Sequence, residues 1–191
     1  GYFGDGQLRR IAFAGGPSQA LAKVGNQVRG ATWLPDGTIV YSPDAGEALW
    51  RIGENSGDPQ PLTHLRAERE ERTHRWPGQL PGGKAILFTV DTRKTTEFYD
   101  DAEIEAVIVT TGERKTVLRG SSAARYLDPG ILVFARGGAL FATRFDPAAL
   151  EVRGSPVPVL QEVATNIASG AVQFDLSSAG GLLWAPGAPS L

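Results

Sequence analysis

The chain has no cysteine, no run of about 18 apolar residues and no excess of basic residues. Without cysteine it forms no disulfide bond and has no thiol chemistry. Without a long apolar run we do not expect this sequence to span a membrane, and it does not open with a signal peptide. The 19 basic residues are outnumbered by 21 acidic ones, which gives a formal net charge of −2. This balance argues against nucleic acid as a partner.

Methionine is also absent, even from position 1, so we expect the sequence to be cut from a longer chain. The only two histidines, His64 and His74, do not stand at metal-ligand spacing from each other or from a carboxylate. No Gly-x-Ser-x-Gly segment marks a nucleophilic serine, and Gly120-Ser121-Ser122 has the composition of a loop. The sequence therefore predicts a protein that is not an enzyme, and it indicates neither a metal nor a cofactor.

Glycine and proline, by contrast, are plentiful, at 24 and 13 residues. They recur in a tight turn, Pro-Asp-Gly or a variant of it, that is followed by a wholly apolar strand. The turn glycines Gly37, Gly83, Gly130 and Gly180 are 46, 47 and 50 residues apart. A period of roughly 40 to 50 residues that contains only strands is typical of propeller blades. The predicted fold class is all-β: a β-propeller of four-stranded antiparallel blades, with about four blades present as part of a larger propeller.

The repeat divides the chain into five units, which we interpret as one propeller domain or fragment spanning residues 1–191. The first unit is predicted to have three strands and the last unit two, Ala171–Leu176 and Leu182–Ala185. The three units between them are predicted to have four strands each. The approximate bounds of the units are 1–25, 26–66, 67–120, 121–163 and 164–191.

Two charged segments interrupt the strands. Arg66–Arg72 (RAEREER) could form a partner-binding patch or a helical turn, but its composition favours a solvated loop between two units. The insertion Asp91–Glu103 carries carboxylates at Asp91, Asp100, Asp101 and Glu103. Hard cations bind converging carboxylates, but the spacing of a calcium loop is missing here. A solvated surface loop is therefore the favoured interpretation of this segment as well.

Two arginines, Arg29 and Arg75, occupy equivalent positions, each eight residues before the turn glycine of its unit. Both fall on the innermost strand, which faces the central channel of a propeller. Guanidinium groups in a channel suit recognition of an anion or a carboxylate. We therefore predict a ligand-binding site at Arg29 and Arg75, with His74 and Gln173 as weaker members. The alternative is that each arginine pairs with a carboxylate or with solvent and holds the blades together.

Short segments along nearly the whole chain match a known family in their order and spacing. They are Ala14-Gly15-Gly16-Pro17, Arg29 to Trp33 with Asp36 to Tyr41, His74 to Pro77 with Leu80-Pro81, Gly112 to Lys115, Gly154 to Val157, and Val163 to Asn166 with Gly170 to Phe174. These units resemble the WD-like propeller repeats of the TolB-like superfamily. More narrowly, they are similar to the periplasmic propeller that follows the transmembrane helix in many bacterial serine/threonine protein kinases.

Two departures limit what this resemblance implies. Gly82 stands where the turn of the repeat usually carries aspartate. The kinase lobe is absent, since the sequence has no glycine-rich phosphate loop followed by lysine and no His-Arg-Asp catalytic loop. The resemblance therefore implies a periplasmic or extracytoplasmic sensor or interaction domain without kinase activity, and it names no ligand.

The function predicted from the sequence is that of a non-catalytic β-propeller that binds a ligand or a protein. It would form the extracytoplasmic sensor or scaffold region of a larger bacterial signalling protein. Two alternatives stay open: the propeller domain of a prolyl-oligopeptidase-like serine peptidase, and a TolB-like periplasmic scaffold. Because so few units cannot close a ring cleanly, we expect an open arc with unpaired strand edges at both ends. Such edges predict association with the remaining blades of a parent protein or with a second copy.

Overall fold

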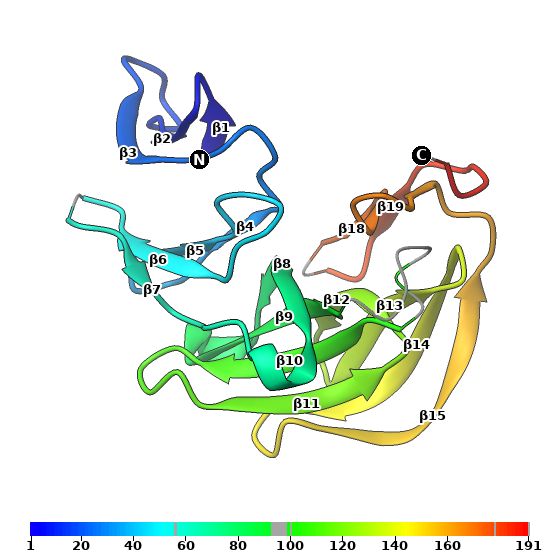
Figure 1. The fold of residues 1–191 in the computed structure, drawn as a ribbon. Coiled ribbons are helices and arrows are strands. Elements are labelled where there is room, and N and C mark those ends of the chain that lie inside the picture. Colours follow the sequence, from blue (N-terminus) through cyan, green and yellow to red (C-terminus); the bar gives the residue numbers. More distant parts are fainter. Residues whose placement is uncertain (56, 93–98, 100, 178, 191) are drawn as a thin grey trace.

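The computed structural model describes residues 1–55, 57–92, 99, 101–177 and 179–190, and these residues form mainly β-strands (Figure 1). The helices among them are two single-turn 3-10 helices, η1 (Ala67–Arg69) and η2 (Pro81–Gly83). No helix in the described part of the chain has the length and apolar character needed to cross a membrane. The strands form antiparallel sheets in which each strand pairs with its neighbours in sequence. The predicted all-β class is confirmed.

Three sheets have four strands in simple sequential order, as expected of propeller blades. The second sheet along the chain contains β4 (Ala31–Trp33), β5 (Thr38–Tyr41), β6 (Trp50–Gly53) and β7 (Gln60–Pro61). The third contains β8 (Glu71–Gln79), β9 (Ala85–Thr92), β10 (Glu103–Ile108) and β11 (Arg114–Arg119). The fourth contains β12 (Ser122–Leu127), β13 (Ile131–Arg136), β14 (Ala139–Asp146) and β15 (Glu151–Leu160).

The first sheet has three strands, as predicted: β1 (Tyr2–Gly4), β2 (Gln7–Arg10) and β3 (Gln19–Lys23). It lies at one end of an arc of sheets, and the C-terminal strands lie at the other end (Figure 1). Among the described residues no sheet joins the first unit to the last.

The last unit differs from the prediction of two continuous strands. The expected strand Ala171–Leu176 is divided at Gln173 into β17 (Ala171–Val172) and β18 (Phe174–Leu176). An unpredicted strand, β16 (Thr165–Asn166), pairs with β17, while β19 (Leu182–Trp184) pairs with β18. The division has a simple cause, because Gln173 N–H donates to Ala164 O (2.9 Å) and its carbonyl accepts from Ala185 N–H (3.0 Å). The strand thus changes its partner at this residue.

The apolar core lies between neighbouring sheets, and the inner sheets are buried on both faces. Along β9, Ile86 and Phe88 pack against the second sheet, whereas Leu87 packs against the fourth. The same alternation occurs on β5 and β13, since successive side chains of a strand point to opposite faces. This double burial explains why the strand after each turn is wholly apolar.

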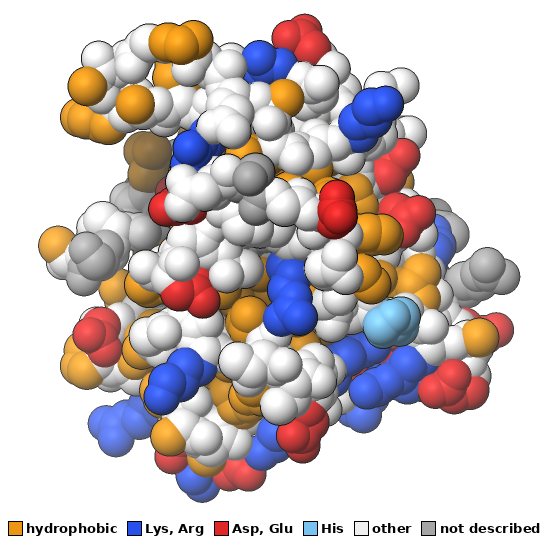
Figure 2. Space-filling view, turned by 90° about the vertical axis from the view of Figure 1, so that its left-hand side faces the viewer, with side chains coloured by type: hydrophobic (Ala, Val, Ile, Leu, Met, Phe, Trp, Pro, Cys, Tyr) orange, Lys and Arg blue, Asp and Glu red, His pale blue; other side chains and the backbone are white. Residues whose placement is uncertain are grey.

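The N-terminal sheet is less well covered than the inner sheets. In the face of the molecule drawn in Figure 2, hydrophobic side chains gather at the top, over this sheet. Ile11 and Phe13, in the connection between β2 and β3, are exposed. At the opposite end of the arc, Leu183 is 76% exposed and Trp184 is 43% exposed on β19.

The two charged segments differ only in part from the predicted solvated loops, and residues 93–98 of the insertion lie outside the described residues. Arg66–Arg72 includes η1 and the start of β8, and Glu71 is 6% exposed. In the insertion, Asp91 near the end of β9 and Glu103 at the start of β10 are buried. Asp101 is exposed. Asp100 lies outside the described residues. Both buried carboxylates form ion pairs with arginines, Asp91 with Arg72 and Glu103 with Arg69.

The four turn glycines have the backbone conformation that the repeat requires. Gly37, Gly83, Gly130 and Gly180 have φ values of 85°, 67°, 77° and 85°. Residues with a side chain rarely adopt this left-handed region. Gly83 also meets the preceding unit, because a Cβ atom there would lie 2.7 Å from Cδ of Pro35.

We predict that Gly83→Ala destabilises the fold more than Gly82→Ala does. Both residues have positive φ, so each substitution costs about 1 to 2 kcal/mol of backbone strain. A Cβ at residue 82 meets nothing within 4 Å, whereas one at residue 83 collides with Pro35 and adds about 1 to 3 kcal/mol. Urea unfolding of both variants measures the difference. Equal losses would show that this contact between units is unimportant.

Candidate functional site

A cavity of about 770 Å³ opens at the centre of the arc. It lies between the inner strands β4, β8 and β12 and the segment that begins at β18. Its wall combines apolar side chains with a few polar ones, as is common in ligand sites. The lining residues that carry a charge or an amide are Gln79, Arg125, Asp128 and Asp175.

Arg125, on β12, is the only basic residue among the described residues that line the cavity. Its Nη1 donates to the carbonyls of Ala124 (3.0 Å) and Trp76 (3.4 Å). Its Nε and Nη2 have no hydrogen bond or ion pair within the described part of the chain. Burial lowers the pKa of Arg125, and the carboxylate of Asp175 opposes that shift. An arginine stays charged under such conditions, so an unpaired cation borders the cavity.

Gly78 places β8 in van der Waals range of Arg125. A Cβ at residue 78 would be 3.4 Å from Nη1 and 3.6 Å from Cδ of Arg125. The guanidinium is thus held by two strands of neighbouring sheets. Its position is set by the packing of the sheets and by the carbonyls it contacts.

Two carboxylates share the cavity with Arg125. Asp128 accepts a hydrogen bond from the Tyr126 hydroxyl (3.2 Å), and Asp175 accepts one from the backbone N–H of Leu176 (2.9 Å). Both aspartates are exposed, and neither lies within ion-pair distance of a described lysine or arginine. The cavity therefore contains charges of both signs that are not neutralised by contact.

Arg75, predicted to bind a ligand, is buried and bonded to protein atoms. It donates to the carbonyls of Ser169 (2.6 Å) and Ala45 (3.1 Å) and to the hydroxyl of Tyr99. Its guanidinium carbon lies 4.9 Å from the centre of the Tyr99 ring. These contacts join the second, third and last units, which is the blade-holding role left open by the sequence. A role in binding a ligand stays a prediction.

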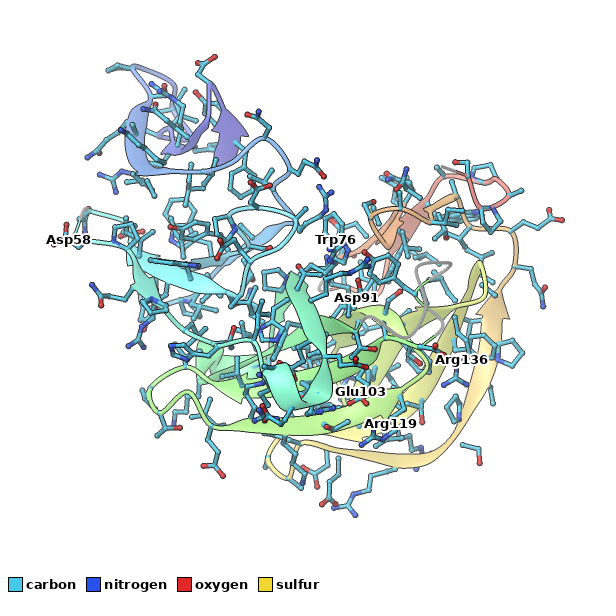
Figure 3. All side chains as sticks on the ribbon, in the orientation of Figure 1. Asp58, Trp76, Asp91, Glu103, Arg119 and Arg136 are labelled. Atoms are coloured by element: carbon cyan, nitrogen blue, oxygen red, sulfur yellow. The ribbon has the colours of Figure 1, made fainter. Side chains whose placement is uncertain are left out.

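The other predicted residues also lie outside the lining of the central cavity. Arg29 donates to the Gln27 side chain (2.8 Å) and to the Val28 carbonyl (3.2 Å). Gln173 is exposed, at the point where the last inner strand is divided. Like Arg75, Arg29 has a buried Nε without a partner among the described residues. Figure 3 shows Trp76, which follows Arg75 on β8, toward the inside of the arc, with Arg119 on the outer side.

His74 is fully buried between the second and third sheets. Its Nδ1 lies 2.7 Å from Oγ1 of Thr63, and its Nε2 lies 3.1 Å from Oε2 of Glu71. Burial lowers the pKa of His74, which favours the neutral ring. The neutral ring donates from Nε2 to the ionised Glu71 and accepts at Nδ1 from Thr63.

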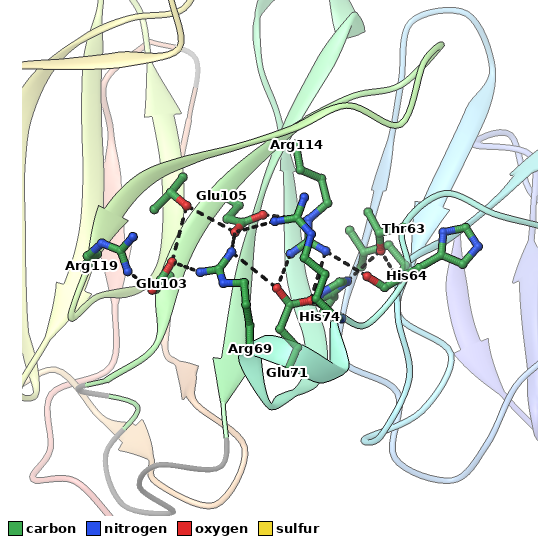
Figure 4. Close-up of polar contacts among 12 residues, drawn as sticks. Thr63, His64, Arg69, Glu71, His74, Glu103, Glu105, Arg114 and Arg119 are labelled. Atoms are coloured by element: carbon green, nitrogen blue, oxygen red, sulfur yellow. Dashed lines mark hydrogen bonds and ion pairs between the residues drawn. The ribbon is translucent and has the colours of Figure 1, made fainter.

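Glu71 connects His74 to a buried network of ions (Figure 4). Arg114 donates to Glu71 (2.8 Å) and to Glu105 (2.7 Å), and Arg69 donates to Glu105 (2.7 Å). Burial by itself would raise the pKa of Glu71, but hydrogen bonds from His74, Arg114 and the Arg66 backbone lower it to about 2.

Within the network each carboxylate has an arginine partner, and Arg114 also donates to the His64 carbonyl (2.9 Å). The network thus links η1, β8, β10 and β11 to one another and to His64, which follows the second sheet. The described residues contain no group of three or more histidines and carboxylates placed to hold a metal ion. The paired charges of the ionic network suit a structural role.

Sequence reasoning missed both Arg125 and the ionic network. Arg125 lies five residues before its turn glycine, whereas Arg29 and Arg75 lie eight residues before theirs, so the repeat does not align Arg125 with them. The network carried a partial signal: Glu103 and Glu105 alternate with the apolar residues Ile104 and Ala106, and the following strand begins and ends with arginine. Charged residues at every second position of a strand indicate one polar face.

We predict that Glu71→Gln destabilises the protein at neutral pH but much less at low pH. The pKa of Glu71 is lowered from 4.5 to about 2, so ionised Glu71 contributes about 3 kcal/mol to stability. That contribution is complete above pH 4.5 and is lost as the pH falls through about 2. Chemical unfolding of both proteins across this range measures it.

A matched control is Glu151→Gln, which removes the exposed ion pair with Lys115 (3.0 Å). Exposed pairs contribute little to stability, so the control should unfold almost like the wild type. A loss in Glu71→Gln that stays the same from neutral pH to pH 2 would contradict the ionic role of this carboxylate.

Comparison with known proteins supports the fold but not an activity. No protein-family model matches the sequence, and no curated protein matches it significantly. A putative TolB from Agrobacterium tumefaciens is 18% identical, with a TM-score of 0.61 over 83% of this chain and 56% of its own. Regucalcin, a calcium-binding protein from the same species, is 13% identical, with a TM-score of 0.64 over 95% and 60%. Oligogalacturonate lyase from Vibrio parahaemolyticus is 13% identical, with a TM-score of 0.58 over 86% and 45%.

At these identities the likeness concerns the fold alone. The chain spans about half the length of these structures, between 45% and 60%. They include both a TolB and an enzyme, so the shared architecture does not select one activity. This chain therefore has the blade architecture of a β-propeller, with TolB-like folds among its structural relatives.

Proposed function

We propose that this chain is a non-catalytic binding module in the extracytoplasmic sensor or scaffold region of a larger bacterial signalling protein. The observation that carries the proposal is the central cavity of about 770 Å³, with its unpaired charges and mixed wall. Cavities of roughly 300 to 1,000 Å³ hold small molecules in other proteins. The strands around it are fixed by sheet packing, so the cavity is formed before a ligand arrives.

The other polar cluster supports the same assignment. In the ionic network the carboxylates are bonded to arginines, and His74 is closed off from solvent. A general base needs access to the proton it removes. The cavity, by contrast, has exposed charged groups along its wall, which suits binding.

A TolB-like scaffold is a second candidate, favoured by the TolB structures among the similar folds. The coding sequence on either side of this chain separates the possible parent proteins. A membrane-spanning segment and a kinase lobe upstream would support the sensor proposal. A Gly-x-Ser-x-Gly segment downstream would instead support a peptidase propeller.

We predict that filling the cavity abolishes ligand binding. Gln79 is exposed on β8 and lines the cavity, so Gln79→Trp should block it. Gln60→Trp, on the outer strand β7, is a matched control, because Gln60 is also an exposed strand glutamine. A thermal-shift screen of amino acids, peptides, sugars, sugar acids and phosphates identifies ligands, which raise the melting temperature of the protein they bind.

The expected ligand stabilises the wild type and Gln60→Trp but not Gln79→Trp, and mass spectrometry recovers it unchanged. Equal stabilisation of all three proteins would place binding outside the cavity. Turnover of the ligand would contradict a non-catalytic role.

We also propose that the ends of the arc associate with further blades or with a second copy. Leu183 and Trp184 on β19 are exposed at the last edge, and Tyr2 on β1 is 42% exposed at the first. Unpaired strands with apolar side chains favour such pairing.

We predict that light scattering of the isolated chain gives a mass above the 20.3 kDa of one copy. Leu183→Lys should shift the protein toward the monomer, because it places a charge on the unpaired edge. Val157→Lys, at an exposed residue of the complete fourth sheet, is the control and should leave the mass unchanged. A wild type that stays monomeric would contradict the association.

A further inference from the structure

The central cavity contains charged groups that the fold leaves without partners. Within the described residues, Arg125 has two uncommitted nitrogens, and neither Asp128 nor Asp175 makes an ion pair. The buried network shows the opposite arrangement, since its carboxylates are bonded to arginines. The contrast indicates that the charges in the cavity are available to a ligand.

The uncommitted nitrogens of Arg125 lie on one edge of its guanidinium. Nη1 is the nitrogen bonded to the carbonyls of Ala124 and Trp76, which leaves Nε and Nη2. The N–H bonds of Nε and Nη2 on that edge are nearly parallel, with a spacing that matches the two oxygens of a carboxylate. Because the other edge is held by protein carbonyls, the fork is oriented before it meets a ligand.

The two aspartates determine which anion fits best. The lining contains one cation and two carboxylates, so its formal charge is −1. A phosphate dianion would be repelled by Asp128 and Asp175 even while it was attracted to Arg125. A carboxylate that belongs to a molecule with an ammonium group avoids this repulsion, since the ammonium neutralises an aspartate.

The rest of the wall fits a small organic ligand. Apolar side chains also line the cavity. They are Pro35 between β4 and β5, Pro77 on β8, Leu80 and Pro81 between β8 and β9, and Phe174 and Leu176 on β18. These groups can cover the aliphatic part of a ligand, while Gln79 supplies an amide donor and acceptor. The volume of about 770 Å³ accommodates an amino acid or a short peptide.

From these observations we infer that the central cavity binds a small zwitterion, an amino acid or a short peptide. Its carboxylate binds the Nε–Nη2 edge of Arg125, and its ammonium group faces Asp175 and Asp128. The inference rests on the proposed function, because it specifies the ligand of that binding module.

The test compares wild type, Arg125→Gln and Asp175→Asn, with Arg144→Gln as the control. Arg144 is an exposed arginine of the same sheet, on β14, outside the cavity. The probes are the free amino acids and a set of dipeptides, followed by the N-acetylated and C-amidated forms of the best binder and by inorganic phosphate. Thermal shifts identify the binder, and isothermal titration calorimetry gives each Kd.

We expect at least one zwitterion to bind the wild type, and its acetylated and amidated forms to bind more weakly. Arg125→Gln should raise the Kd at least about tenfold, through loss of a bidentate charge-assisted contact. Asp175→Asn should raise it less, and Arg144→Gln should leave it unchanged. Arg125→Lys is the second variant if the glutamine fails to fold, and it should also bind weakly, because an ammonium lacks the planar fork.

The result that overturns the inference differs from the one that overturns the proposed function. If only phosphate or a neutral ligand binds, and Gln79→Trp blocks it, the cavity is a binding site but not one for zwitterions. A zwitterion whose Kd is unchanged in Arg125→Gln also overturns the inference alone. If the zwitterion binds Gln79→Trp as well as it binds the wild type, the cavity is not the site and both proposals are wrong.

Discussion

Burial of both faces of each inner sheet is the constraint on which this structure depends. A strand such as β9 has apolar side chains on both sides, and neither side is stable in water. One side packs on the preceding sheet and the other on the following sheet, so each unit is stable only between its neighbours. The arc is the result of repeating that arrangement. Its two ends have one face and one edge that lack a neighbouring sheet, which is why exposed apolar residues occur there.

The packing of the sheets determines which polar groups are buried and which are exposed. Between the sheets, Glu71, Glu105 and Arg114 are almost fully buried, and an unpaired charge there would be very costly. Their pairing is therefore required by the fold. At the centre of the arc the inner strands diverge around a cavity, where water can solvate Asp128 and Asp175. Charges at this position need no protein partner, and they can serve in recognition.

The inner strands thus carry arginines in two different surroundings. Through Arg75, the third sheet is bonded to Ala45 of the second unit and to Ser169 of the last, which keeps the units in fixed positions around the centre. Arg125, one sheet further along, is held by carbonyls at Nη1, and its Nε and Nη2 have no hydrogen bond within the described residues. Two arginines on inner strands therefore differ in their contacts because of what surrounds them.

The sequence by itself determined the all-β class, the repeated turn glycines and the wholly apolar strands, since these follow from local conformation and from alternation along a strand. It also located Arg75 on an inner strand, but it was wrong for Arg29, which precedes β4 and lies in no strand. It did not determine the division of the last strand at Gln173, the burial of Glu71 and Glu103, or the position of Arg125 in the cavity. Those features depend on hydrogen bonds and ion pairs between residues far apart in the chain, such as Arg69 with Glu103 and Arg125 with Trp76. Only the tertiary structure brings such pairs together, because no local pattern specifies which distant strand will lie alongside.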